Sequence, residues 1–434
     1  MKKLHLFLLI IFFFQNITFA QSIDTVYTQK YLERSTSFAW TTFGGDILML
    51  GGGSSSFVNN GTSQNINFNQ TFIPRLTIGG VHFWGHTDFY VTFPLSFFSY
   101  QSTPKEFKEL EYRQGIETGI KIYPLPLKSG RISPYIGTSF RLLNFKQQLE
   151  GTSYKYGGSE WQKMIFPLQI GLSYTSKKYI WNVGLNYQAL QKIENYISPN
   201  QVAEVKFSPI SFQIGLTRYI DTDKNMRSQK NIAQENLKHH ILDKEKHLSS
   251  WYWGLGPSAG LQISKSPYLK TNFPHLYDNF IGGFMPDITF GRFLNKPDMN
   301  IGLSYRTLGS TLKAFDDKIS IRRHSFMIEI YKNLFNWLGF VPFAGITGSI
   351  ENLNVKVNDL TFNQTKPAIG FIFGWDIRVT KTGTNLLRTN LRWIPNLNLE
   401  IDNKKMMFDN LEFNFIQWVQ FIGRKKTYKK YQSN

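Results

Sequence analysis

The sequence contains no cysteine among its 434 residues. This absence excludes a fold held together by disulfides and a lipid anchor on a cysteine that follows a signal sequence. Acidic residues are also scarce, because 30 Asp and Glu face 49 Lys and Arg, a formal net charge of +19. After residue 20 no apolar run approaches the roughly 20 residues of a transmembrane helix, and helical spacing is convincing in one segment only. With 41% hydrophobic residues, the sequence therefore predicts an all-β chain.

The first 20 residues have the features of a signal peptide. Lys2 and Lys3 form a short positive region, an apolar stretch covers 6–14, and a small-x-small cleavage motif ends at Ala20. We therefore expect the mature chain to be exported. Export separates the chain from nucleic acid, so its positive charge fits anionic lipid head groups and an anionic cell surface better.

A period of two runs through the chain, and residues 168–188 show it most clearly. Apolar side chains occupy every second position on both sides of a Ser-Lys-Lys turn, with polar residues or glycine between them. This spacing predicts a β-hairpin with one apolar and one polar face. The hairpin by itself leaves open whether the apolar face meets a protein core or lipid.

Segments of this kind recur about eight times on each side of a polar stretch at 221–250. Short turns between them alternate with longer polar loops, an alternation typical of outer-membrane barrels, in which short turns face the periplasm and long loops face outward. The predicted strands are 38–50, 70–83, 88–99, 113–124, 133–147, 163–175, 178–190 and 204–220, followed by 251–263, 280–294, 299–311, 319–333, 339–351, 367–380, 385–397 and 407–423.

Aromatic residues and mid-strand charges indicate the orientation of the two faces. Phe, Trp and Tyr make up 16% of the chain and gather near predicted strand ends, as the aromatic girdles of a membrane barrel require. We interpret the apolar rows as facing lipid and the polar rows as facing the lumen, in preference to a soluble β-sandwich. The candidate lumen-lining residues are Asp88, Glu117, Lys121, Arg141, Asp376, Arg378, Arg388 and Arg392.

The segment "GIKIYPLPLKSGRISPYIGTSFRLL" at 119–143 resembles bacterial outer-membrane β-barrel proteins of the small OmpA/OmpX-like, porin-like type. The resemblance extends loosely over 36–220 and includes "SFQIGLTRYI", which looks like the terminal assembly signal of that family. It implies an antiparallel transmembrane β-barrel in the cell outer membrane, with outer-membrane lipid and the barrel assembly machinery as partners. It carries no catalytic or binding residues to transfer.

The halves can be aligned, which suggests a duplicated eight-strand unit. We divide the chain into a signal peptide (1–20), a first repeat (21–220), a polar and helix-compatible periplasmic linker (221–250), a second repeat (251–424) and a basic tail (425–434). The linker could join two eight-strand barrels, or it could be an insertion into one barrel of about sixteen strands. We favour the single large barrel, because assembly depends on one C-terminal signal strand.

The most favoured function is passive, a pore for small solutes. In one wide lumen Arg378, Arg388 and Arg392 would outnumber Asp376 and make the pore prefer anions. The alternative is a sealed barrel with a structural or surface-interaction role in the cell envelope. We predict no enzyme, cofactor or metal, and a hydrolase is less favoured because no serine–acid partner accompanies the candidate histidines His82, His86 and His324.

Overall fold

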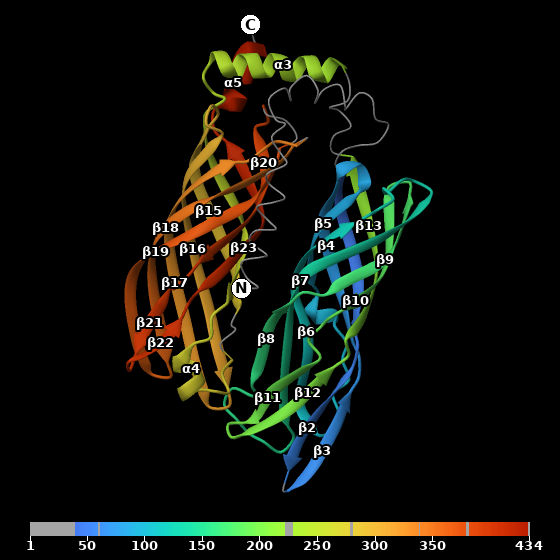
Figure 1. Cartoon of the computed structure of the whole chain (residues 1–434), viewed down its shortest axis with the longest axis vertical. Coiled ribbons are helices and arrows are strands. Elements are labelled where there is room, and N and C mark those ends of the chain that lie inside the picture. Colours follow the sequence, from blue (N-terminus) through green and yellow to red (C-terminus); the bar gives the residue numbers. More distant parts are fainter. Residues whose placement is uncertain are drawn as a thin grey trace, which may run out of the picture.

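The computed structural model describes residues 40–59, 61–221, 229–277, 281–337, 339–378 and 382–432. The predicted signal peptide lies outside these residues. Nearly all the regular structure is antiparallel β-sheet, and it forms two barrels that stand side by side (Figure 1). No helix in these ranges combines the length and apolarity needed to cross a membrane.

Eight strands of the first half close into a ring. Their order around it is β6, β5, β4, β1, β13, β10, β9 and β7, and pairing of β6 with β7 completes the circle. The strands are β1 (Trp40–Leu50), β4 (Thr71–His82), β5 (Thr87–Pro94), β6 (Phe107–Ile122), β7 (Arg131–Leu149), β9 (Leu168–Ser176), β10 (Tyr179–Tyr187) and β13 (Ile210–Asp221).

Eight strands of the second half form a closed barrel in chain order, in which the first strand, β14, pairs with the last, β23. These strands are β14 (Ser250–Gln262), β15 (Ile281–Leu294), β16 (Met299–Ala314), β17 (Asp317–Asn333), β18 (Phe340–Val357), β19 (Leu360–Ile377), β20 (Asn385–Ile394) and β23 (Asn410–Phe421).

The preference for one barrel of about sixteen strands was therefore wrong. β1 pairs along its whole length with β13, from Trp40 opposite Asp221 to Leu50 opposite Ser211. In a single sixteen-strand barrel, the backbone N–H and C=O groups of β13 would instead pair with a strand of the second half. They are already paired with β1. Because each half closes on itself, neither offers a free edge to the other.

The predicted orientation of the faces is confirmed at 168–188. In β9 and β10 the apolar row is 42–61% exposed, whereas Gln169, Ser173, Asn182 and Asn186 are at most 6% exposed. A soluble sandwich would bury the apolar row. Instead, this row lies on the outside of the ring and the polar row lies inside. The outward apolar residues of both barrels form what we call the apolar belt.

Several strands run on beyond the apolar belt, and there the polarity of their two faces reverses. On β18, Ile346 and Ile350 are exposed on the outside, whereas Leu353, Val355 and Val357 further along are buried on the inside. Residues 312–318 and 352–366, predicted as loops, therefore belong mainly to the long strands β16–β19, where two-residue turns join β16 to β17 and β18 to β19. The alternation of period two continues through these residues, but the apolar side chains change from the outward to the inward positions.

Other predicted loops also contain regular structure. Residues 51–69 and 191–203 contribute to a four-stranded sheet, 148–162 contains the start of a short strand that ends at Ile165, and 398–406 forms a hairpin. These predictions failed because short alternating segments were taken as polar loops. The added elements are β2 (Gly53–Asn59), β3 (Thr62–Phe68), β8 (Glu160–Ile165), β11 (Lys192–Ser198), β12 (Gln201–Phe207), α4 (Pro267–Asn272), β21 (Asn398–Ile401) and β22 (Lys404–Met407).

All these added elements lie at one end of the barrels, which we call the long-loop end. The opposite end, the short-turn end, carries the helices α3 (Gln229–Lys244) and α5 (Arg424–Gln432) (Figure 1). Arg424 joins α5 to the barrel by donating to the carbonyl oxygens of Gly383 and Leu248 at 2.8 and 3.0 Å. Burial lowers the pKa of the Arg424 guanidinium to about 10. The last strand ends at Phe421, and the predicted basic tail is largely helix α5.

The two barrels touch at both ends. At the short-turn end, the 3₁₀ turn η1 (Phe83–Gly85) places the ring of Phe83 4.7 Å from that of Trp337 and 5.6 Å from that of Phe340. Phe83 has φ = 53°, a left-handed conformation that is costly for a bulky residue. At the long-loop end, the Tyr156 N–H donates to the Phe315 carbonyl oxygen at 2.8 Å. The two halves are therefore in direct contact at both ends.

Candidate functional site: the two barrel interiors

The eight predicted lumen residues all lie inside the barrels, divided equally between them. None is more than 9% exposed. The strand alternation explains this position, because seven of them occupy inward positions of their strands and Arg378 continues the same parity one residue past the end of β19. The first barrel holds Asp88, Glu117, Lys121 and Arg141, and the second holds Asp376, Arg378, Arg388 and Arg392.

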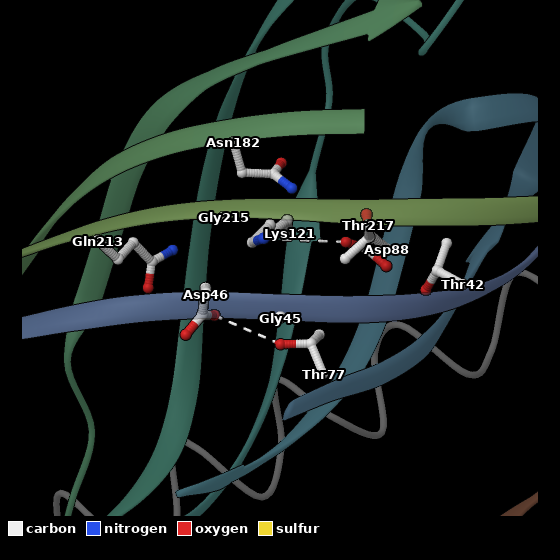
Figure 2. Close-up of a pocket in the computed structure, with 10 residues that line it drawn as sticks. All are labelled: Thr42, Gly45, Asp46, Thr77, Asp88, Lys121, Asn182, Gln213, Gly215 and Thr217. Carbon is white, nitrogen blue, oxygen red and sulfur yellow. Dashed lines mark hydrogen bonds and ion pairs between the residues drawn. The ribbon is translucent and has the colours of Figure 1, made fainter. Parts of the chain in front are cut away.

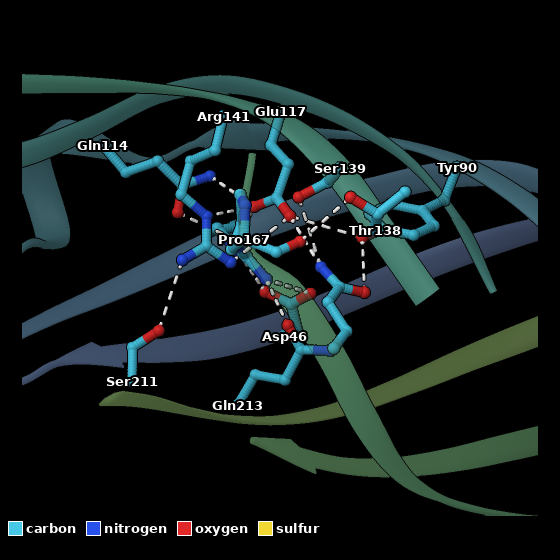
Figure 3. Close-up of polar contacts among 12 residues, drawn as sticks. Asp46, Tyr90, Gln114, Glu117, Thr138, Ser139, Arg141, Pro167, Ser211 and Gln213 are labelled. Carbon is cyan, nitrogen blue, oxygen red and sulfur yellow. Dashed lines mark hydrogen bonds and ion pairs between the residues drawn. The ribbon is translucent and has the colours of Figure 1, made fainter. Parts of the chain in front are cut away.

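Glu117 is the centre of the network in the first barrel (Figure 3). Its carboxylate accepts from Arg75 at 2.6 Å and from Arg141 at 3.1 Å. Arg75 also pairs with Asp46 at 2.5 Å. The side-chain amide of Gln169 donates to Glu117 at 3.0 Å. Both arginines are almost fully buried, so these charges neutralise one another where water is largely excluded.

Lys121 and Asp88 form a second, looser pair nearer the short-turn end (Figure 2). Their charged atoms are 3.9 Å apart, and the Lys121 ammonium lies 4.9 Å from the centre of the Tyr90 ring and 5.2 Å from that of Tyr135. Lys121 and Asp88 border a cavity of about 10 Å³, together with Asp46. That volume holds about one water molecule.

The second barrel contains a denser set of ion pairs. The Arg392 guanidinium donates to Asp287 at 2.5 Å and to Glu329 at 2.7 Å. All three side chains are at most 2% exposed. Asn414 adds a hydrogen bond of 2.8 Å to Asp287, and Ser304 adds one of 2.7 Å to Glu329. Arg392 thus bridges two carboxylates on β15 and β17 from its place on β20.

Glu412 on β23 joins two further arginines of the second barrel. It pairs with Arg306 and, at 2.8 Å, with Arg323. Arg323 also donates to Glu351 at 2.6 Å, and Ser325 donates to the same carboxylate at 2.8 Å. The chain of contacts therefore runs from β16 across the lumen to β23, and from there to β17 and β18.

Arg388 closes the interior towards the short-turn end. It forms a bidentate pair with Asp376 at 2.7 and 3.0 Å, and Arg378 donates to the same carboxylate at 3.1 Å. The Arg388 guanidinium also lies 5.2 Å from the centre of the Tyr331 ring and 5.3 Å from that of Tyr252. Cation–π contacts of this kind fill the cross-section with side chains.

In the described interiors, acidic and basic partners are equal in number. The ion-paired set is Asp46, Asp88 and Glu117 with Arg75, Lys121 and Arg141 in the first barrel, and Asp287, Glu329, Glu351, Asp376 and Glu412 with Arg306, Arg323, Arg378, Arg388 and Arg392 in the second. The expected excess of arginine came from comparing three of them with Asp376 alone. The missed residues carry the same signal as those found, a charge at an inward position in mid-strand.

An apolar core covers the charged layer at the long-loop end of each barrel. In the first, Phe57 and Phe207 of the four-stranded sheet pack with Tyr112 and Phe145 of the barrel wall. In the second, Leu399 of the β21–β22 hairpin belongs to one cluster with residues of α4 and of the long strands. These cores resemble the interior of a soluble domain, in which large side chains leave few voids.

The candidate histidines do not form a catalytic or metal constellation. His86 Nδ1 lies 2.8 Å from the Tyr123 carbonyl oxygen, and His82 is buried beside the ring of Phe89. His324 Nδ1 lies 3.0 Å from the Tyr305 hydroxyl. Within the residues that the structure describes, no group of three or more His, Cys, Asp or Glu side chains is placed to hold a metal ion.

No family model and no curated protein matches the sequence. Among solved structures, the chain is similar to Neisserial surface protein A at 16% identity and a TM-score of 0.28, over 39% of this chain and 96% of that one. It is similar to the attachment invasion locus protein Ail of Yersinia pestis at 6% identity and a TM-score of 0.25, over 40% of this chain and 97% of Ail. It is also similar to an outer-membrane channel from Pseudomonas putida F1 at 8% identity and a TM-score of 0.21, over 90% of this chain and 98% of the channel.

The fold is that of an outer-membrane β-barrel, in two copies. This assignment rests on the closed antiparallel strand order and the outward apolar belt of this chain itself. The resemblance to the small OmpA/OmpX-like barrels is thus confirmed at the level of architecture.

Proposed function

We propose that the chain is an outer-membrane protein whose two barrels are sealed, and that its role is structural or surface-interacting rather than conducting. The observation that carries this proposal is the filling of both interiors by paired charges beneath an apolar core. An eight-stranded barrel is just wide enough for its side chains to fill the lumen. The geometry therefore favours the alternative to the pore.

The apolar belt supports a membrane position. Side chains such as Ile328, Ile346 and Phe371 are exposed by 46–56%, and they would be poorly placed in water. Only closed barrels and helices satisfy their backbone groups inside a bilayer, and both halves close. We place the short-turn end, with α3 and α5, in the periplasm and the long-loop end outside the cell.

Export and assembly follow from the same proposal. Residues 1–20 would act as a signal peptide, and β23, which ends at Phe421, would be presented to the barrel assembly machinery. The surrounding outer-membrane lipid would be the main partner of the belt. Surface interactions would involve the long-loop end, where the four-stranded sheet and the β21–β22 hairpin project from the barrels (Figure 1).

Fractionation and conductance test the proposal together. The full-length protein should be recovered in the outer membrane and should migrate faster on gels before heating than after it. Reconstituted into planar bilayers, it should give no stable ion current. A steady current would support the pore, and recovery in the soluble periplasm would contradict the membrane position.

A deletion variant shows which layer seals the second barrel. Replacing 398–407, the β21–β22 hairpin, with a short Gly-Ser linker removes part of the apolar core and leaves the ion pairs in place. We expect this variant to stay silent, because the charged layer still blocks the lumen. The wild-type protein, inserted in parallel and checked for heat modifiability, is the control.

A further inference from the structure

The wall of the first barrel has a gap at the long-loop end. β5 stops at Pro94, whereas its neighbours β4 and β6 continue beyond it. The 95–106 segment crosses the gap and makes two backbone hydrogen bonds of 3.0 Å between Tyr100 and Phe72. A cavity of about 290 Å³ remains between this segment and β6.

Two polar groups at this cavity lack a hydrogen-bond partner. The Thr71 hydroxyl belongs to a side chain that is 1% exposed, and the Gln101 side-chain nitrogen is buried. In the described part of the chain neither atom is bonded, although both residues line the cavity. Buried donors without a partner are rare in native proteins, so they call for an explanation such as a ligand.

The cavity lining carries two cations, Lys108 and Arg113, and two anions, Glu109 and Glu111, and one of the two cations has no ion pair among the residues described. Glu111 pairs with Arg113 at 2.7 Å, and Glu109 pairs with Lys146 at 2.7 Å. Lys108 also lines the cavity, and it has no ion pair among the residues described. A guanidinium and a free ammonium suit a phosphate, whereas amide, hydroxyl and carboxylate groups suit sugar hydroxyls.

Two phenyl rings beside the cavity are exposed. Phe97 and Phe98 lie on the 3₁₀ turn η2 (Ser96–Phe98) and are 100% and 72% exposed. Ser96 and Ser99, next to these rings in the chain, line the cavity. The turn follows β5 closely in the chain. It lies beyond the last residue pair between β5 and β6, which is Thr92 opposite Glu117. The rings therefore lie at the border of the apolar belt, where outward side chains become charged.

We propose that this cavity binds the phosphorylated sugar headgroup of a glycolipid in the outer leaflet, and that the two phenyl rings pack against its acyl chains. The inference rests on the proposed membrane position and adds a ligand class to it. A peptide that added a strand to the edge of β6 would fit less well. The backbone N–H of Tyr112 on that edge already donates to the side-chain oxygen Oε1 of Gln101 at 2.8 Å.

The test measures binding of purified lipopolysaccharide to the folded full-length protein in detergent. Lys108→Glu should raise the Kd at least tenfold, because it replaces the unpaired cation with an anion. Lys105→Glu, an exposed lysine of the same segment outside the cavity, should stay within twofold of wild type. Removing the phosphates from the glycolipid should weaken wild-type binding by a similar factor.

A second variant pair separates a lipid source from a soluble one. The double variant Phe97→Ser and Phe98→Ser should bind the intact glycolipid at least tenfold more weakly but leave binding of the free, delipidated oligosaccharide unchanged. Phe166→Ser, another exposed phenylalanine of the first barrel, is the matched control. All variants are checked for heat modifiability, so that loss of folding is recognised.

The outcomes are distinct. Equal binding by Lys108→Glu and wild type, or equal binding of the dephosphorylated glycolipid, overturns the headgroup assignment. Free oligosaccharide that binds as tightly as the glycolipid overturns the lipid source. A protein that inserts into the outer membrane but does not bind lipopolysaccharide contradicts this inference alone, whereas one recovered in the soluble periplasm contradicts the proposed function as well.

Discussion

Arg392 offers the most direct test of a sealed second barrel. Its guanidinium is 1% exposed and donates to Asp287 at 2.5 Å and to Glu329 at 2.7 Å. Arg392→Met keeps much of the side-chain length but removes the charge and the donors. Asp287 then retains the amide of Asn414, and Glu329 retains the hydroxyl of Ser304. Within the described residues, neither carboxylate keeps a hydrogen-bonded arginine.

The expected loss of stability is large. Removing one partner of a buried ion pair generally costs about 3–5 kcal/mol, because the other charge stays buried without compensation. An exposed lumen arginine in a wide pore would contribute less than about 1 kcal/mol. The size of the effect therefore distinguishes a filled interior from a water-filled one.

The assay is urea unfolding of the full-length protein in lipid vesicles, with the folded fraction read from unheated gels. Arg322→Met, at an exposed position on β17, should change the free energy of unfolding by no more than about 0.5 kcal/mol. Combining Arg392→Met with Asp287→Asn and Glu329→Gln should recover most of the loss, because no charge remains unpaired. A loss below about 1 kcal/mol for Arg392→Met alone would refute the reasoning.

Other predictions address the remaining contacts. Glu117→Gln should lower the stability of the first barrel by about 3 kcal/mol or more in the same assay, because it leaves two buried arginines short of a carboxylate; an unchanged midpoint would contradict this. Chains of 21–221 and 250–434, refolded separately, should each give a heat-modifiable band, and failure of both would show that the barrels depend on each other. Phe340→Ala should increase proteolysis between the barrels without unfolding either one. Arg424→Ala should make α5 accessible to protease while the barrel remains heat-modifiable, and an α5 that stays protected would show that other contacts hold it.

The class of the fold and the orientation of its faces could be predicted from the residues alone. Apolar and polar residues alternate strictly over 168–188. Because successive side chains of a strand point to opposite faces, Ile170 and Gln169 must lie on opposite faces of the sheet. The absence of a long apolar run and the abundance of aromatic residues then predicted that the apolar face meets lipid. The inward charges, from Asp88 to Arg392, followed from the same parity.

Tertiary structure alone decided how many barrels these strands make. The number depends on whether β13 pairs with β1 or with a strand of the second half, and the two choices bury similar residues and satisfy the same backbone groups. Nothing in a period of two distinguishes the partner, because alternation specifies a face and not a neighbour. The filling of the lumen followed from this choice, since a ring of eight brings Arg392 within reach of Asp287 and Glu329.

The cores at the long-loop end were hidden from sequence reasoning for a related reason. Leu353, Val355 and Val357 continue the alternation of β18, but they lie on the face that is polar lower down the strand. An apolar row faces outward where the outside of the barrel is apolar, and it faces inward where the outside of the barrel is aqueous. The environment changes along a strand whose pattern stays the same, so only the folded chain showed where the belt ends and the apolar core begins.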